Sequence, residues 1–177
     1  MRKLLPLLIC LLFFGNAKAQ YVTIPDAKFV TWLQANVPSA MVGNQMDTTD
    51  AAVISLKRIV VANDSIGDLT GVQYFDSLRT LDCGNGQNMP NVNYILSLPT
   101  LPIFLDTLIC GRNKITVLPA LPSQLKVLHC YENLLNALPS LPNSLLELNC
   151  GFNGLVSLPV LPNSLISLSC YGDTLTG

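Results

Sequence analysis

Five of the six cysteines and the only histidine are the side chains whose types and spacing could support chemistry. Four of these cysteines recur every 20 residues, at Cys110, Cys130, Cys150 and Cys170, and Cys83 ends the same Leu-x-x-Leu-x-Cys motif further upstream. Thiols can form disulfides, bind zinc as thiolates or act as nucleophiles. His129 adjoins Cys130, so a Cys–His catalytic pair is one hypothesis.

The element that must carry these cysteines argues against each of these reactions. Leu-x-x-Leu-x-Cys is typical of a short strand with its fourth and sixth residues on one face. Adjacent strand residues point to opposite faces, so His129 and Cys130 cannot form a dyad. Stacked strands lie ~4.8 Å apart, whereas the β-carbons of a disulfide lie ~3.8 Å apart, and a line of sulfurs is not a tetrahedral zinc site. We expect buried free thiols; the alternative is disulfides between neighbouring strands, which denaturing alkylation would detect.

The cysteine motif belongs to a longer repeat that organises most of the chain. With Leu105 as position 1, one unit reads Leu-x-x-Leu-x-Cys-x-x-Asn-x-Ile-x-x-Leu-Pro-x-Leu-Pro-x-x. Such a unit cannot bury its apolar face alone and must stack on its neighbours, which predicts an α/β repeat solenoid. The units are 56–77, 78–104, 105–124, 125–144, 145–164 and a partial unit, 165–177.

Two further positions of the unit have predictable roles. Proline cannot lie inside a helix or a central strand, so the Leu-Pro-x-Leu-Pro tract favours a polyproline II segment with Leu118 and Leu121 facing inward. Position 9 is asparagine in three units, and its amide can satisfy both donors and acceptors of a turn. Asp64, Asp173 and Gly86 replace asparagine elsewhere, and residues 84–91 look like an insertion that forms an irregular loop.

Taken together, these positions resemble the leucine-rich repeat pattern L-x-x-L-x-L-x-x-N/C-x-L. The Leu-Pro-x-Leu-Pro tracts are similar to the 20-residue repeats of bacterial leucine-rich repeat effectors, and residues 63–72 look like the 22-residue repeats of internalin-type surface proteins. The resemblance covers residues 56–177. It implies a right-handed horseshoe with short parallel strands on the concave face, extended segments on the convex face, a small helical N-terminal cap and an asparagine ladder at position 9.

The N-terminal 19 residues have the features of a secretory signal peptide. Arg2 and Lys3 precede an apolar run of 11 residues, and Ala17-Lys18-Ala19 is a small-x-small cleavage motif. Cleavage would leave seven basic residues against eleven acidic ones, which argues against nucleic acid as a partner. The apolar run is too short to span a membrane. We therefore expect a secreted or cell-surface protein with no membrane span.

Residues 20–55 lack the repeat and are expected to cap the hydrophobic end of the solenoid. The segment 24–35 predicts a helix that begins near Pro25, with Asp26 in its first turn and with Trp32 docking on the first coil. The segment 47–50, Asp-Thr-Thr-Asp, favours a helix N-cap over a calcium loop. At the other end the sequence shows no cap, so end-to-end self-association through the last coil is one expectation.

Function is expected on the strand side, where positions 2, 3, 5, 7 and 8 face outward. Exposed aromatic residues among polar groups favour a protein or glycan contact; the alternative is that these aromatics only cover the strands. We expect a non-catalytic binding module that needs no metal or cofactor, or else a structural segment of a larger surface adhesin or effector with no ligand of its own. The candidate binding residues are Arg112, Lys126, His129, Tyr131, Glu132, Asn149, Phe152 and Tyr171.

Overall fold

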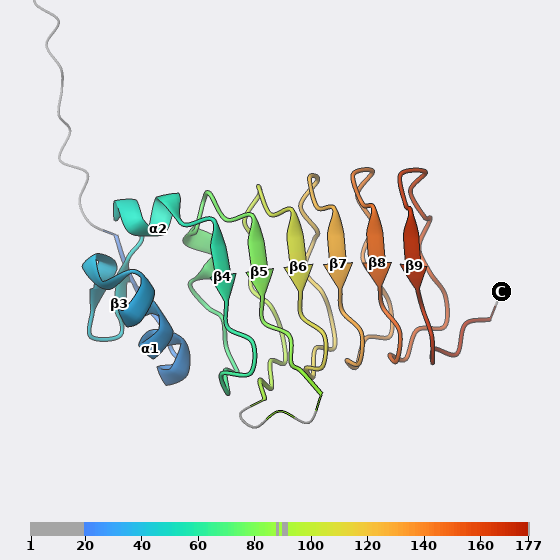
Figure 1. Cartoon of the computed structure of the whole chain (residues 1–177), viewed down its shortest axis with the longest axis horizontal. Coiled ribbons are helices and arrows are strands. Elements are labelled where there is room, and N and C mark those ends of the chain that lie inside the picture. The colour runs from blue at the N-terminus through green and yellow to red at the C-terminus, as the bar shows by residue number, and fades with distance from the viewer. Residues whose placement is uncertain (1–19, 88, 90–91, 177) are drawn as a thin grey trace, which may run out of the picture.

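The computed structural model of the chain describes residues 20–176 except 88, 90 and 91, so the predicted signal peptide at residues 1–19 lies outside the described residues. Six short parallel strands lie side by side in chain order and form one sheet along the molecule (Figure 1). Each strand belongs to one coil of a solenoid, which confirms the predicted fold class. The strands are β4 (Arg58–Val60), β5 (Thr80–Asp82), β6 (Thr107–Ile109), β7 (Val127–His129), β8 (Glu147–Asn149) and β9 (Ser167–Ser169).

The strand register follows the repeat. Every strand occupies positions 3–5 of its unit, and the position-4 residues pair across neighbouring strands, as Leu108 pairs with Leu128 and Leu128 with Leu148. Since side chains alternate along a strand, positions 4 and 6 face the same side. Leucine therefore lies on leucine and cysteine on cysteine through the interior, and position 4 is fully buried from Ile59 to Leu148.

The return side of each coil is extended and contains tight turns. In the last four coils a proline carbonyl accepts a hydrogen bond from the position-1 backbone N–H, as Pro122 O does from Leu125 N at 3.1 Å. Leu118 is buried, as predicted, whereas Leu121 is only half-buried. The first coil differs from the others because it contains a short 3₁₀ helix, η2 (Val72–Tyr74).

The N-terminal cap combines helices with a small antiparallel sheet. The helices are α1 (Ala27–Asn36), η1 (Pro38–Ala40) and α2 (Ala51–Ser55), and the sheet has the order β1-β3-β2. Its strands β1 (Tyr21–Thr23), β2 (Met41–Val42) and β3 (Gln45–Asp47) were absent from the sequence-based expectation. They have only two or three residues each, too few to show an alternation of apolar and polar residues.

Two aspartates begin the helices of the cap. Asp26 is the N-cap of α1, where its Oδ1 accepts from the N–H groups of Lys28 and Phe29. The helix thus starts after Asp26, not at Pro25 as the sequence suggested. Asp50 caps α2 by accepting from Ala52 N at 2.7 Å, which confirms the N-cap interpretation of residues 47–50.

The cap is tied to the first coil by the same aspartate that begins α1. The Oδ2 of Asp26 accepts from Gly67 N at 2.8 Å and from Asp68 N at 3.2 Å. Trp32 is partly buried against the core. Within the described residues, no helix has the length and apolar character needed to cross a membrane.

Candidate functional site

The turn after each strand is held by the position-9 asparagine. The Nδ2 of Asn133 donates to the carbonyls of Cys110 and Cys130 at 3.1 and 3.0 Å, and its Oδ1 accepts from Ile115 N at 3.0 Å. Asn113 and Asn153 repeat this arrangement with their own neighbours. One amide therefore joins two successive coils, and it sets the direction in which positions 7 and 8 leave the strand.

The ladder residue of the second coil is Asn93, which corrects the sequence-based assignment of Gly86. Asn93 Nδ2 donates to the carbonyls of Val61 and Cys83, and its Oδ1 accepts from Ile66 N. The extra seven residues of this unit lie before position 9, so counting from the strand reached Gly86 too early. Asn85, expected to face outward, is buried and hydrogen-bonded to the backbone of Asn93 in both directions.

Position 8 adopts a left-handed backbone in the other coils. The φ angles are 61° at Asn63, 59° at Arg112, 49° at Glu132, 55° at Phe152 and 80° at Gly172. This conformation suits glycine and asparagine, while a bulky residue there is an outlier. A left-handed backbone costs ~1–2 kcal/mol per ordinary L-residue, and such strain is concentrated at functional sites. The chain thus places three large side chains where glycine would be more stable.

These side chains form one edge of the sheet, beyond the C-terminal ends of the strands. Arg112 forms an ion pair with Glu132, with Nη2–Oε1 at 2.8 Å, and its guanidinium lies over the Tyr131 ring at 5.7 Å from the centroid. The hydrogen bond to Glu132 raises the pKa of Arg112, which therefore stays charged. We call Arg112, Tyr131, Glu132, Phe152 and Tyr171 the C-terminal edge.

Two aromatic rings of this edge rest on glycines of adjacent coils. A β-carbon at Gly111 would lie 2.6 Å from the Tyr131 ring, and one at Gly172 would lie 2.5 Å from the Phe152 ring. Tyr131 is half-buried by this contact, whereas Phe152 is 57% exposed and Tyr171 is 81% exposed. Tyr131 therefore packs on its neighbour and is also partly exposed, whereas most of the Phe152 and Tyr171 side chains face solvent.

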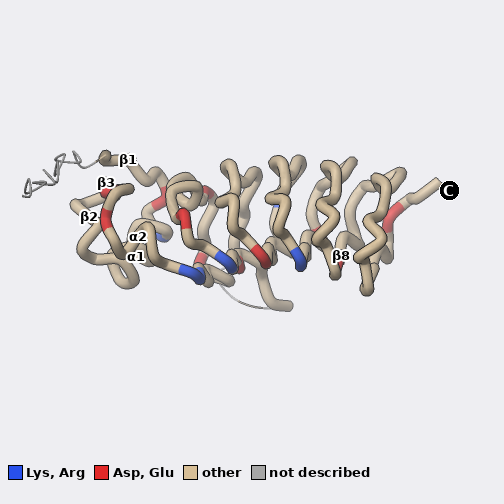
Figure 2. Tube along the Cα trace, turned by 90° about the horizontal axis from the view of Figure 1, so that it is seen from above, with Lys and Arg blue, Asp and Glu red and all other residues tan. Residues whose placement is uncertain are grey.

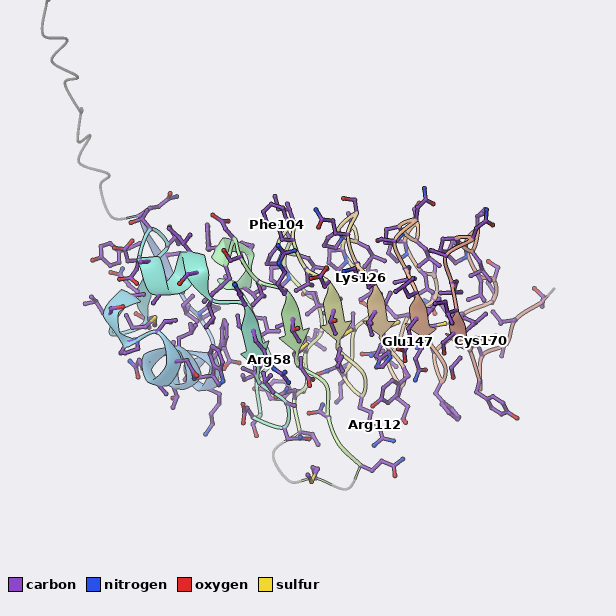
Figure 3. The ribbon with its side chains drawn as sticks, turned by 45° about the horizontal axis from the view of Figure 1, so that its top comes forward. Arg58, Phe104, Arg112, Lys126, Glu147 and Cys170 are labelled. Atoms are coloured by element: carbon purple, nitrogen blue, oxygen red, sulfur yellow. The ribbon has the colours of Figure 1, made fainter. Side chains whose placement is uncertain are left out.

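A second charged row lies at the opposite ends of the strands. Asp106 lies between Lys126 and Arg79, with N–O distances of 3.4 and 3.7 Å, and the Arg79 guanidinium lies over the ring of Phe104. Position 2 is charged in the first four coils and apolar in the last two, as Lys57, Arg79, Asp106, Lys126, Leu146 and Ile166. Figure 2 shows basic and acidic residues close together along the early coils and an acidic residue again near the C-terminal end. Figure 3 shows Phe104 and Lys126 near the starts of the strands and Arg112 beyond their ends.

A histidine–glutamate pair lies between the two rows. The Nε2 of His129 lies 2.8 Å from Oε1 of Glu147, and Asn149 pairs directly with His129 across the strands. These residues are partly exposed on the outer face of β7 and β8. A residue at position 3 of one unit thus contacts a residue at position 5 of the previous unit.

The structure divides the predicted site residues among these three groups. Arg112, Tyr131, Glu132, Phe152 and Tyr171 share the C-terminal edge, His129 and Asn149 lie on the strands, and Lys126 lies in the far charged row. Position 8 follows position 2 by six residues, which is up to ~20 Å in an extended chain, so the far charged row and the C-terminal edge lie at opposite ends of the strands. The sequence analysis did not include Glu147, Asp106 and Phe104 among the site residues. Glu147 is at position 3 of its unit and contacts His129 at position 5 of the previous unit, so a comparison of these two positions between neighbouring units would have indicated it.

Four of the five thiols in the described part of the chain are buried beneath this surface. The five described cysteines are free, and Cys83, Cys110, Cys130 and Cys150 are buried while Cys170 is partly exposed. Burial raises the pKa of the Cys150 thiol to about 12 and the pKa of Cys110 well above its usual range. A thiol reacts as the thiolate, so the buried members are unreactive at neutral pH. Among the described residues, no group of histidine, cysteine and acidic side chains could hold a metal ion.

Comparisons with known proteins agree with this architecture. No protein-family model and no curated protein matches the sequence. Among solved structures, a Shigella effector LRR domain is 32% identical with a TM-score of 0.60, over 67% of this chain and 50% of that one. YopM, a leucine-rich effector protein from Yersinia pestis, is 32% identical with a TM-score of 0.50, over 58% and 29% of the two chains. The functional domain of InlJ from Listeria monocytogenes, which includes a cysteine ladder, is 20% identical with a TM-score of 0.47, over 90% and 44%.

The parallel strand sheet, the asparagine ladder and these similarities define a leucine-rich repeat solenoid. The chain accordingly has the leucine-rich repeat fold, and the solved structures similar to it include bacterial effectors. It spans half or less of the length of each of the three solved chains described above.

Proposed function

We propose that this chain is a secreted or cell-surface binding module that recognises a protein partner through the C-terminal edge and the adjoining strand face. The observation that carries the proposal is Phe152, a bulky residue in the left-handed conformation with 57% of its side chain exposed. A residue kept only for folding would be glycine there, as Gly172 is in the next coil. The ring rests on Gly172 along one side and is otherwise exposed, so its packing alone does not account for a strained, bulky residue at this position, which supports a contact role.

The neighbouring residues have the composition of an interaction surface. Aromatic residues and arginine are enriched at the centres of protein interfaces. Here two exposed rings, Phe152 and Tyr171, lie on the same edge as Arg112, whose side chain is held by Glu132 and Tyr131. A pre-positioned side chain loses less conformational entropy on binding. A glycan partner at the same edge is the second candidate, because exposed rings beside charged groups also suit sugars.

The Phe152→Gly variant tests the proposal. Glycine relieves the left-handed strain, so we expect unfolding free energy to stay the same or to rise by up to ~1 kcal/mol. Capture of the partner from the extracellular fluid or cell surface of the source should at the same time be lost. Val156→Gly, at a similarly exposed position on the return side, is the matched control and should keep capture. A Phe152→Gly protein that is destabilised and still captures its partner would show that the ring only covers the strands.

Secretion and the absence of catalysis belong to the same proposal. The features of residues 1–19 support export, and the unreactive thiols support a non-catalytic role. N-terminal sequencing of protein recovered from the culture medium should begin at Gln20. An uncleaved chain retained in the cell would contradict export.

End-to-end pairing of two copies is a further partner hypothesis. In the last coil, position-4 Leu168 is 41% exposed, whereas the equivalent Leu148 is fully buried. Sedimentation should show dimers that Leu168→Glu converts to monomers. A monomer at all concentrations would dismiss self-association through this coil.

A further inference from the structure

A cleft of about 370 Å³ lies between α1 and the turn that leaves β4. The strand β4 is at the cap end of the sheet, and β8 and β9 are at the other end (Figure 1). Lys28, Trp32 and Asn36 line it from the helix, and Asn63, Asp64 and Ser65 line it from the turn. The volume is at the lower end of the usual range for small-ligand pockets. The cleft combines one large aromatic side chain with several polar groups, which is the usual composition of a ligand site.

Hydrogen bonds hold both walls of the cleft in place. Asp26 caps α1 with one carboxylate oxygen and binds the N–H groups of Gly67 and Asp68 with the other, so the helix and the first coil are joined. On the turn, Asn93 Oδ1 accepts from Asp64 N at 3.1 Å, and Asn63 Oδ1 accepts from Gly86 N at 2.8 Å. A rigid site loses little conformational entropy when a ligand binds.

The turn is also strained. Asn63 and Ser65 have φ angles of 61° and 59°, so two residues within three adopt the left-handed conformation. No other coil has a second such residue within its described part. Strained backbone persists where the surrounding structure holds it and where it serves a site. The strain is found next to the cleft, in the only coil that faces the cap.

Trp32 provides a flat apolar surface. Its ring stacks on the buried Phe29 at a centroid distance of 6.3 Å and an interplanar angle of 24°, which fixes the indole. Part of the side chain remains exposed and lines the cleft. An indole can cover the C–H face of a flat ligand while its polar N–H stays near solvent.

The polar groups around Trp32 include both hydrogen-bond donors and hydrogen-bond acceptors. Asn36 uses Nδ2 to donate to Trp32 O, which leaves its Oδ1 as an acceptor, and Asn63 uses Oδ1, which leaves its Nδ2 as a donor. Lys28 adds a positive charge and Asp64 a negative one, and among the described residues neither forms an ion pair. The charges cancel, which disfavours both a phosphate and a cation as the ligand.

We propose that this cleft binds a neutral saccharide, with a sugar ring lying on Trp32 and its hydroxyls bonded to Asp64, Asn63 and Asn36. Each hydroxyl both donates and accepts, so a sugar can use the carboxylate and the amides together. The site is separate from the C-terminal edge and does not depend on the proposed partner there. A leucine-rich repeat module of this kind would hold a sugar at its cap and a protein along its strands.

The only tryptophan of the chain provides a direct measurement, because every change in its emission reports on Trp32. We would titrate the full-length protein with three neutral disaccharides, cellobiose, maltose and N,N′-diacetylchitobiose, and follow fluorescence together with saturation-transfer NMR of the sugar. A saturable response to at least one of them is expected. Absence of both signals for all three at saturating sugar would overturn the proposal.

Variants then locate the binding. Asp64→Ala removes a carboxylate that accepts no hydrogen bond among the described residues and should weaken binding about tenfold or more. Asp76→Ala, an equally exposed aspartate of the same coil, should bind like the unmodified protein. Binding that survives Asp64→Ala together with Asn63→Gly would place the sugar elsewhere. Tighter binding of inorganic phosphate that is lost in Lys28→Ala would show that the ligand is anionic.

Discussion

The first and last coils have the same motif and yet differ in how well they are buried. At position 4, Ile59 of the first coil is fully buried, whereas Leu168 of the last coil is 41% exposed. At position 6, Val61 is buried and Cys170 is only partly so. The cap covers the outer side of the first coil, while the last coil has a packed neighbour on one side only (Figure 1). In a solenoid, the burial of a residue therefore depends on its neighbouring coils as much as on its own type.

The comparison extends to the asparagine ladder. Asn93 binds two carbonyls and closes the turn of the first coil. At the other end Asp173 binds Asn153 N and Leu155 N through Oδ1, but its Oδ2 is buried without a hydrogen-bond partner among the described residues. A carboxylate oxygen cannot donate to carbonyls as an amide nitrogen does. The first coil carries Asp64 at position 9, and its turn is closed by an amide from the second coil, whereas at the last coil the rung itself is a carboxylate.

Truncation of position-4 leucines should give the largest contrast. Leu128→Ala removes a fully buried side chain and should lower the free energy of unfolding by ~2–5 kcal/mol. Leu168→Ala should lower it by less than ~1 kcal/mol, because much of the side chain is already exposed. Urea unfolding followed by circular dichroism measures both. Equal losses would mean that the last coil is as well packed as the middle ones.

Loss of a ladder amide in the middle should be the next largest effect. Asn133→Ala leaves the buried carbonyls of Cys110 and Cys130 without this donor and should cost ~1–3 kcal/mol. Hydrogen exchange of Ile115 N, which donates to Asn133 Oδ1, should accelerate. If stability is unchanged and exchange remains slow, the ladder does not hold the turns. Asn136→Ala, at an exposed position of the same coil, is the matched control.

Alkaline pH should destabilise the interior through its thiols. Burial holds the pKa of Cys150 at about 12 in the folded chain, against ~8.5 for an unfolded thiol. Between these two pH values the unfolded chain loses the thiol proton, whereas the folded chain keeps it. The contribution of the thiol to the free energy of unfolding is therefore fully present below pH ~8.5. Above that pH the free energy of unfolding falls by about 1.4 kcal/mol per pH unit for each such thiol. Unfolding measured from pH 8 to 11 should show this slope. Cys110→Ala, which removes one thiol with a raised pKa, should make this slope smaller.

Repair of the last rung should give the smallest effect of these comparisons, and that effect should be a gain in stability. Asp173→Asn supplies the missing amide and should raise the free energy of unfolding by about 1 kcal/mol. The gain should appear in urea unfolding and as slower hydrogen exchange at Leu155 N. Asp76→Asn, an exposed change of the same type, should have no effect. A loss of stability in Asp173→Asn would show that the buried carboxylate oxygen has a favourable environment.

The sequence analysis was most successful where the information was local. The strand register, the buried cysteines and three ladder asparagines follow from positions counted within one unit, because side-chain alternation is set by the backbone itself. The candidate site was recovered less completely. Five of its eight residues share one edge, but Glu147 and Asp106 bind His129 and Lys126 from neighbouring coils, and spacing within one unit does not show such contacts.

By itself, the sequence determined the 20-residue coil, the inward columns of leucine and cysteine and the outward positions, because a repeated motif must repeat its backbone. Only the tertiary structure decided where the extra residues of the second coil loop out, which placed Asn93 in the ladder. It also decided the small sheet of the cap, the left-handed backbone at Phe152 and the cleft beside Trp32. These features arise where segments far apart in the sequence meet, and their geometry depends on both partners.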